Sequence, residues 1–133
     1  MRMIIRVPGP VPNWNLYIND ERRNRYAAAK EKRDEKIRAK AAAHGKKWSG
    51  RYPITITVIS HFQNKRRDLD NVRIKGLIDG FVAAGVIRND NLTYIREYHF
   101  LSTVDDWEGM EFVLEEWKEK CDGEGKARSA DNP

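Results

Sequence analysis

The sequence has little cysteine and histidine and no long apolar run. A single cysteine, Cys121, excludes an internal disulfide framework and is typical of a reducing compartment. The three histidines, His44, His61 and His99, are scattered and have no zinc-ligand spacing. No apolar segment approaches the roughly 20 residues that span a bilayer. The N-terminal MRMIIRVPGP has neither the apolar stretch nor the small-residue cleavage site of a secretory signal. We therefore expect a cytoplasmic protein with no membrane partner.

Positive charge exceeds negative charge in this chain, and most of the excess lies in one segment. The 133 residues suit one domain and include 25 Lys or Arg and 20 Asp or Glu, a formal charge of +5. Residues 20–47 alone hold 11 Lys or Arg and 5 Asp or Glu, an excess of six positive charges. Such an excess suits a polyanionic partner such as nucleic acid. A solvated helix face with i,i+4 ion pairs would have the same composition, so both interpretations stay open.

Hydrophobic periodicity predicts an α+β domain with two main helices packed on a small mixed β-sheet. The expected strands are residues 2–7, 52–62, 92–102 and 109–117. In the clearest of these strands, Ile54, Ile56 and Val58 point to one face. The domain should span residues 1–117, followed by a flexible polar C-terminal tail at 118–133.

The two expected helices differ in character. Residues 20–44 are rich in Ala and charge, and their apolar stripe is thin, so this helix should lie on the surface. That stripe consists of Tyr26, Ala29, Arg33, Ile37 and Ala41. The three prolines of residues 8–15 should exclude helix there. The second helix, from Ile74 onwards, has apolar residues on one face and should end at Gly85.

Acidic residues gather in the stretch RRDLDNVRIKGLID, residues 66–79. If the chain is extended there, Asp68 and Asp70 project to the same side. Capping of the following helix would use one of the acids but does not need both. A calcium-binding EF-hand loop is excluded, because Val72 and Arg73 occupy its fifth and sixth positions, where an oxygen ligand and a glycine are required. Two converging carboxylates repel each other unless a cation such as Mg²⁺ neutralises them.

Asp90 is the candidate for a third carboxylate, because it lies in the polar loop RNDN that follows the second helix. Three carboxylates would complete a site for phosphodiester hydrolysis with Mg²⁺. Asn71, Lys75 and Asp79 are spaced i, i+4, i+8 and share a helix face. Lys75 either forms a surface ion pair with Asp79 or stabilises charge on a phosphoryl transition state.

These motifs resemble the RusA family of Holliday junction resolvases, which are common in phages and prophages. The matching pieces are RRDLDN, Lys75 and Asp79 on a helix, and AAGVIRNDN. The upstream VPGPVPNWNLY, the basic helix and the next strand are similar too, so the resemblance covers about residues 3–115. It implies a homodimeric, Mg²⁺-dependent endodeoxyribonuclease, with Mn²⁺ as a possible substitute, that nicks four-way DNA junctions in pairs. The compartment would be the host cytoplasm if a phage encodes the protein.

The resemblance also assigns roles to individual residues. It implies that Asp68, Asp70 and Asp90 bind the metal and that Lys75 is the essential basic residue. It makes Asp79 the family's helix aspartate. Asn89 stands where the family usually has another aspartate. The spacing from Asp70 to Lys75 is one residue longer than in the shortest family form, which makes Arg73 a substitute candidate.

Basic and polar residues around the acids complete the expected site. Asn71, Asp79 and Asn89 should support the catalytic residues. Phosphate contacts are expected from Lys65, Arg66, Arg67, Arg73, Arg22, Arg23, Lys30 and Arg33. Trp14 and Tyr17 either stack on unpaired bases or anchor their loop. Two other functions fit the same residues: a non-catalytic protein that binds branched nucleic acid, or a metal-dependent nuclease that cuts flaps or RNA.

Overall fold

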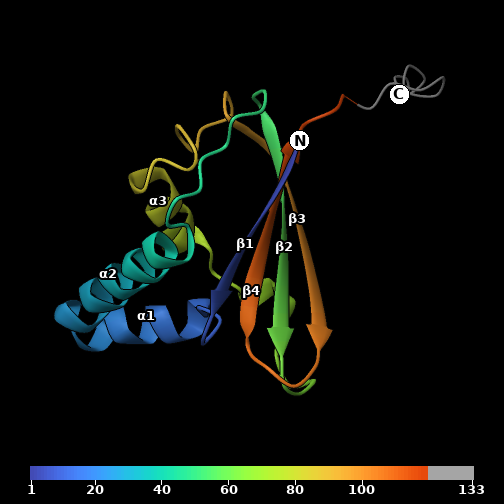
Figure 1. Cartoon of the computed structure of the whole chain (residues 1–133). Coiled ribbons are helices and arrows are strands. Elements are labelled where there is room, and N and C mark those ends of the chain that lie inside the picture. Colours follow the sequence, from blue (N-terminus) through green and yellow to red (C-terminus); the bar gives the residue numbers. More distant parts are fainter. Residues whose placement is uncertain (120–133) are drawn as a thin grey trace, which may run out of the picture.

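The computed structural model describes residues 1–119 and is an α+β fold, which confirms the predicted class (Figure 1). Its elements, in chain order, are β1 (Arg2–Pro8), α1 (Trp14–Arg23), α2 (Arg25–Ala42), β2 (Ile54–Phe62), the 3₁₀ turn η1 (Leu69–Asn71), α3 (Lys75–Ala83), β3 (Ile95–Val104) and β4 (Gly109–Glu116). Cys121 and the expected tail from residue 120 onwards lie outside the described residues.

The four strands form one mixed sheet in the order β1-β4-β2-β3. Strands β2 and β3 are parallel, because α3 carries the chain back across the sheet between them, and β4 is antiparallel to both of its neighbours. All three helices lie on one side of the sheet, and its other face is uncovered (Figure 1). Strand β3 is therefore an edge strand with most of its residues exposed.

The core lies between the sheet and α3. Ile54, Ile56 and Val58 are fully buried, as their alternation in the sequence predicts. Helix α3 contributes Leu77, Ile78 and Phe81, and the ring of Phe81 meets Phe112 of β4 edge to face at 5.0 Å. The helix ends before Gly85, whose positive φ of 81° suits glycine, as expected.

The first helical region differs from the prediction at two asparagines, each of which caps a helix. Helix α1 begins at Trp14, inside the segment where prolines should have excluded helix. The last of those prolines is Pro12, and the Asn13 side chain then accepts the Leu16 N–H at 3.1 Å as an N-cap. The expected single helix is also broken at Asn24, which is extended (φ −156°, ψ 112°) and caps α2 instead.

Helix α2 does not pack through the thin apolar stripe noted in the sequence. Tyr26 is 83% exposed and Ile37 is 64% exposed. The buried residues are Ala28, Glu35 and Ala39. This face packs on two glycines of α3, Gly76 and Gly80. A Cβ atom at Gly80 would lie only 2.5 Å from the Ala39 Cβ, so the two helices approach closely because these positions lack side chains.

Candidate functional site at the start of helix α3

Lys75, the first residue of α3, lies between two carboxylates. Its Nζ is 3.0 Å from Asp90 Oδ2 and 3.1 Å from Asp79 Oδ1. Asp79 is one helical turn further along α3, and Asp90 returns to the helix start from the loop after Gly85. Hydrogen bonds to Asp90 and Asp79 raise the pKa of Lys75, so its ammonium group stays charged well above neutral pH. The fold thus brings Lys75, Asp79 and Asp90 together.

Asp68 and Asp70 come from the segment just before α3. The Asp68 backbone is extended, but Leu69–Asn71 forms a 3₁₀ turn, so the segment is not the continuous extended chain considered from the sequence. Neither η1 nor α3 has a side-chain N-cap. Within residues 1–119, neither carboxylate takes part in a hydrogen bond or ion pair, and both residues are exposed. The capping interpretation therefore does not account for these acids.

Two adjoining hollows connect Asp70 with the Lys75–Asp90 pair. Lys75 and Asp90 line one of about 280 Å³. Asp70 lines a second of about 380 Å³. Val72 and Phe100 line both hollows, so Asp70 and the Lys75–Asp90 pair border one continuous surface.

The carboxylates fit Mg²⁺ in their chemistry. Mg²⁺ prefers oxygen ligands and usually takes one or two carboxylates, and Asp68 and Asp70 offer oxygens that no protein group in the described chain uses. Asp90 is ion-paired with Lys75. In the part of the chain that the structure describes, no three His, Cys, Asp or Glu side chains are arranged to hold a metal ion. A complete set of ligands would need Asp90 to exchange Lys75 for the cation.

Arg73 does not have the predicted DNA-binding role, because it is only 2% exposed. Its guanidinium group pairs with Glu35 and lies 3.8 Å from Glu31, both on α2. It also lies 4.1 Å from the ring centroid of Tyr17 on α1. Arg73 therefore neither reaches a phosphate nor substitutes for Lys75. It fastens the segment before α3 to the first two helices.

The rings of Trp14 and Tyr17 have different surroundings. Tyr17 is 7% exposed and packs against Arg73, so it anchors α1 and does not stack on bases. Trp14 is 42% exposed and lines the hollow that contains Lys75. Of the two interpretations in the sequence, loop anchoring thus holds for Tyr17, and base stacking stays open for Trp14.

Most of the other predicted DNA-contacting residues are on the surface. Arg67 is held by Glu108 at 3.1 Å and lies over the Phe62 ring, and Lys30 pairs with Asp34 at 2.9 Å. Lys30 is nevertheless exposed, as are Lys65, Arg66, Arg22, Arg23 and Arg33. Asn89 has a local role, since its side chain accepts the backbone N–H of Asp90 at 2.7 Å.

Sequence reasoning missed Tyr98 and Phe100 of the edge strand β3. Both line the hollow of Lys75 and Asp90, Phe100 also lines the hollow of Asp70, and both are more than a third exposed. Burial, together with the charge of Asp90, raises the pKa of Tyr98 to about 12, so its hydroxyl group remains a hydrogen-bond donor. In the sequence the segment was recognised only as a strand. The alternation of Tyr98 and Phe100 was the signal for a shared face, but their exposure depends on β3 being the sheet edge.

A separate polar cluster lies at the far end of β2. The two ring nitrogens of His61 are each 2.8 Å from a carboxylate oxygen, one of Asp105 and one of Glu111. Its ring stacks on Trp107 at 4.3 Å. Burial opposes charge on His61, but the hydrogen bonds to the two carboxylates outweigh it and raise the pKa of the imidazole. This cluster ties β2 to the β3–β4 turn and to β4.

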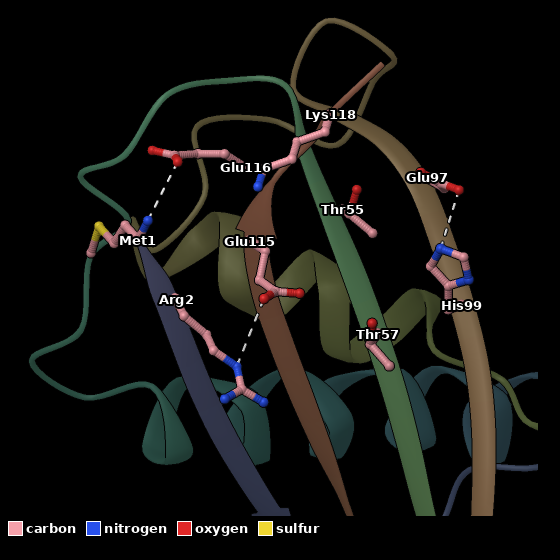
Figure 2. Close-up of a pocket in the computed structure, with 9 residues that line it drawn as sticks. All are labelled: Met1, Arg2, Thr55, Thr57, Glu97, His99, Glu115, Glu116 and Lys118. Carbon is pink, nitrogen blue, oxygen red and sulfur yellow. Dashed lines mark hydrogen bonds and ion pairs between the residues drawn. The ribbon is translucent and has the colours of Figure 1, made fainter. Parts of the chain in front are cut away.

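The uncovered face of the sheet carries a hollow of about 630 Å³ (Figure 2). Figure 2 shows its side chains in front of the strands, with the helices behind. Several of its polar groups already contact one another: Arg2 with Glu115 at 3.9 Å, the N-terminal amine with Glu116 at 3.3 Å, and His99 with Glu97 at 3.1 Å. None of the residues predicted to be functional lies here.

Comparison with models of known protein families finds no match for this chain, and comparison with curated proteins finds no significantly similar sequence. The resemblance to the RusA family therefore depends on the motifs in the sequence alone. Among residues 1–119, no helix is both long enough and apolar enough to cross a membrane.

Proposed function

We propose that this protein is a Mg²⁺-dependent, structure-specific endodeoxyribonuclease that resolves Holliday junctions by paired nicks as a homodimer. The main support is the group at the start of α3, where Lys75 meets Asp90 and Asp79. Beside it, Asp70 lines the adjoining hollow with a carboxylate that has no partner among the described residues. The RusA-like motifs assign these same residues to the active site.

The roles proposed for the residues are those that the RusA resemblance implies. Asp68 and Asp70 would supply oxygen ligands to the metal, joined by Asp90 after it leaves Lys75. When bound, Mg²⁺, or Mn²⁺ in its place, would polarise the scissile phosphate and lower the pKa of a bound water. Lys75 remains protonated, and once released from Asp90 its ammonium group can stabilise negative charge on the phosphoryl group.

Binding of DNA would depend on the exposed basic residues. Lys65 and Arg66 precede the acidic segment, and Arg22 and Arg23 lie in the last turn of α1. Contacts from such side chains to phosphates carry no sequence information and weaken as salt increases. This suits an enzyme that recognises the shape of a junction, and the proposed site of its action is the cytoplasm.

The decisive experiment incubates a synthetic four-way junction with Mg²⁺ and compares wild type with Asp70→Asn. Asp106→Asn is the matched control, because Asp106 is an exposed aspartate in the β3–β4 turn. We expect paired nicks from wild type and the control, and a loss of at least about 100-fold in rate for Asp70→Asn. Equal cutting by wild type and Asp70→Asn would remove Asp70 from the mechanism.

One observation favours a second candidate, a non-catalytic protein that binds branched nucleic acid. In the described residues no three metal-ligating side chains stand ready for a cation. This candidate predicts that the junction is retarded in a gel but not nicked at any Mg²⁺ or Mn²⁺ concentration. If nicking does occur, flap, duplex and RNA substrates in the same assay distinguish a junction resolvase from a nuclease of other specificity.

A further inference from the structure

The surface beside the acids carries three exposed aromatic rings. Trp14 is 42% exposed, Phe100 39% and Tyr98 37%. Trp14 comes from the start of α1, the other two come from β3, and Val72, which lines both hollows, comes from the segment before α3, so three distant parts of the chain meet here. Large aromatic side chains are normally buried, and a group of them on the surface marks a binding site.

The aromatic surface is continuous with the polar groups of the proposed active site. The hollow that contains Lys75 and Asp90 is also lined by Trp14, Tyr98 and Phe100. The neighbouring hollow combines Phe100 with Asp70. A ligand lying on the rings would therefore have hydrogen-bond donors and acceptors at its edge, supplied by Lys75, Asp90 and the Tyr98 hydroxyl group.

A nucleobase fits this combination. It has a flat π-face that stacks on aromatic side chains whatever its identity, and a polar edge for hydrogen bonding. The phosphates attached to it would suit the charge of the chain, since exposed Lys65 and Arg66 precede the acidic segment and the net charge is +5. Bases inside a duplex are already stacked, so only an unpaired base can use the rings.

We propose that Trp14, Tyr98 and Phe100 form a subsite for an unpaired base of a DNA strand whose phosphate lies at Lys75. The inference builds on the proposed nuclease function and adds what selects the substrate. Branched or locally open DNA offers unpaired bases, whereas uninterrupted duplex does not. The subsite would hold the strand next to the acids and so place the adjoining phosphate at the reacting groups.

The test measures binding, without divalent metal, so that it does not depend on cleavage. Oligonucleotides carry the fluorescent base 2-aminopurine, either unpaired at a branch point or paired in a duplex. For wild type, we expect a change in 2-aminopurine fluorescence and tighter binding only with the unpaired base. Phe100→Ala should weaken this binding by about 5-fold or more. Phe100→Leu preserves apolar bulk and folding but removes the ring, so it should lose binding as well, whereas Phe100→Tyr should retain it.

Leu101→Ala is the matched control, because Leu101 is the next residue on β3, is 52% exposed and faces the other side of the sheet. It should bind like wild type. Equal binding of paired and unpaired probes by wild type, or unchanged binding by Phe100→Leu, overturns the subsite. If light scattering instead shows that Phe100→Leu converts a dimer into monomers without affecting base-dependent binding, the rings are an interface between two copies, which also overturns it.

A parallel cleavage assay with Mg²⁺ separates this proposal from the nuclease function. Base-dependent binding that needs Phe100, together with no nicking, refutes the nuclease but supports the subsite. Nicking by wild type and Phe100→Leu at equal rates, with equal binding, refutes the subsite but leaves the nuclease standing.

Discussion

Replacement of Arg73 by methionine should strongly destabilise the fold. The Arg73 side chain is 2% exposed, and its charge faces Glu35, which is 3% exposed. Methionine fills similar space but leaves the Glu35 carboxylate buried with no cation. Breaking a buried ion pair in this way costs about 3–5 kcal/mol in the free energy of unfolding. Small domains have about 5–15 kcal/mol in total, so Arg73→Met would be marginally stable at pH 7.

Acid should relieve much of this loss. Burial raises the pKa of Glu35 even with Arg73 present to oppose it, and without Arg73 the rise should be greater. A carboxyl group whose pKa is higher in the folded state than in the unfolded state binds protons preferentially when folded. The free energy of unfolding therefore rises as pH falls through the folded pKa, by up to about 1.4 kcal/mol per pH unit.

Urea denaturation at pH 7 and pH 5, followed by tryptophan fluorescence, measures both effects. The double variant Arg73→Met/Glu35→Met removes both charges and should recover most of the loss at pH 7, because a buried ion pair can be replaced by apolar side chains at little cost. Arg33→Met is the control on the exposed side of α2 and should stay within about 0.5 kcal/mol of wild type. A loss below about 1 kcal/mol for Arg73→Met at pH 7, or a loss that is the same at pH 5, would refute the reasoning.

Three further predictions concern stability and DNA binding. His61 has a raised pKa, so its bridge to two carboxylates should stabilise the fold fully below about pH 6.5 and be lost as pH rises through the folded pKa; His61→Asn should accordingly cost more at pH 6 than at pH 9 in urea unfolding. Gly80→Ala should lower the free energy of unfolding by about 1–3 kcal/mol through its clash with Ala39, read from the urea midpoint, and an unchanged midpoint would argue against close α2–α3 packing. The double variant Lys65→Ala/Arg66→Ala should reduce the slope of log affinity for DNA against log salt by about 2, and an unaltered slope would mean that neither residue contacts a phosphate.

The strands and α3 could be predicted from the sequence because their apolar periodicity is local. Ile54, Ile56 and Val58 alternate regardless of what covers them, and Gly85 ends α3 through its own backbone freedom. The packing face of α2 could not be predicted from apolar periodicity, because its buried contact is the ion pair of Glu35 with Arg73. Nothing local shows that Glu35 is buried, since only the glycines of α3 and the buried Arg73 make that possible.

The contacts in the candidate site likewise include some that local spacing predicts and others that depend on tertiary structure. Lys75 and Asp79 face each other because they are one helical turn apart, and this follows from the sequence once the helix is recognised. Asp90 could only be suggested, since its approach to Lys75 depends on the course of the loop after α3. Arg73 was assigned to the surface on the basis of its charge, and the tertiary contacts with Glu35 and Tyr17 place it inside.

Residue types and short-range spacing were enough to predict the α+β class, the strand segments and the concentration of acids before α3. The packed chain was needed to show which charged groups are buried, which carboxylate Lys75 meets across the loop, and that the rings of Tyr98 and Phe100 stay exposed. Burial and long-range ion pairs depend on which elements become neighbours, and local sequence does not specify this. The order of the strands, which leaves β3 at the sheet edge, arises only when the whole chain packs.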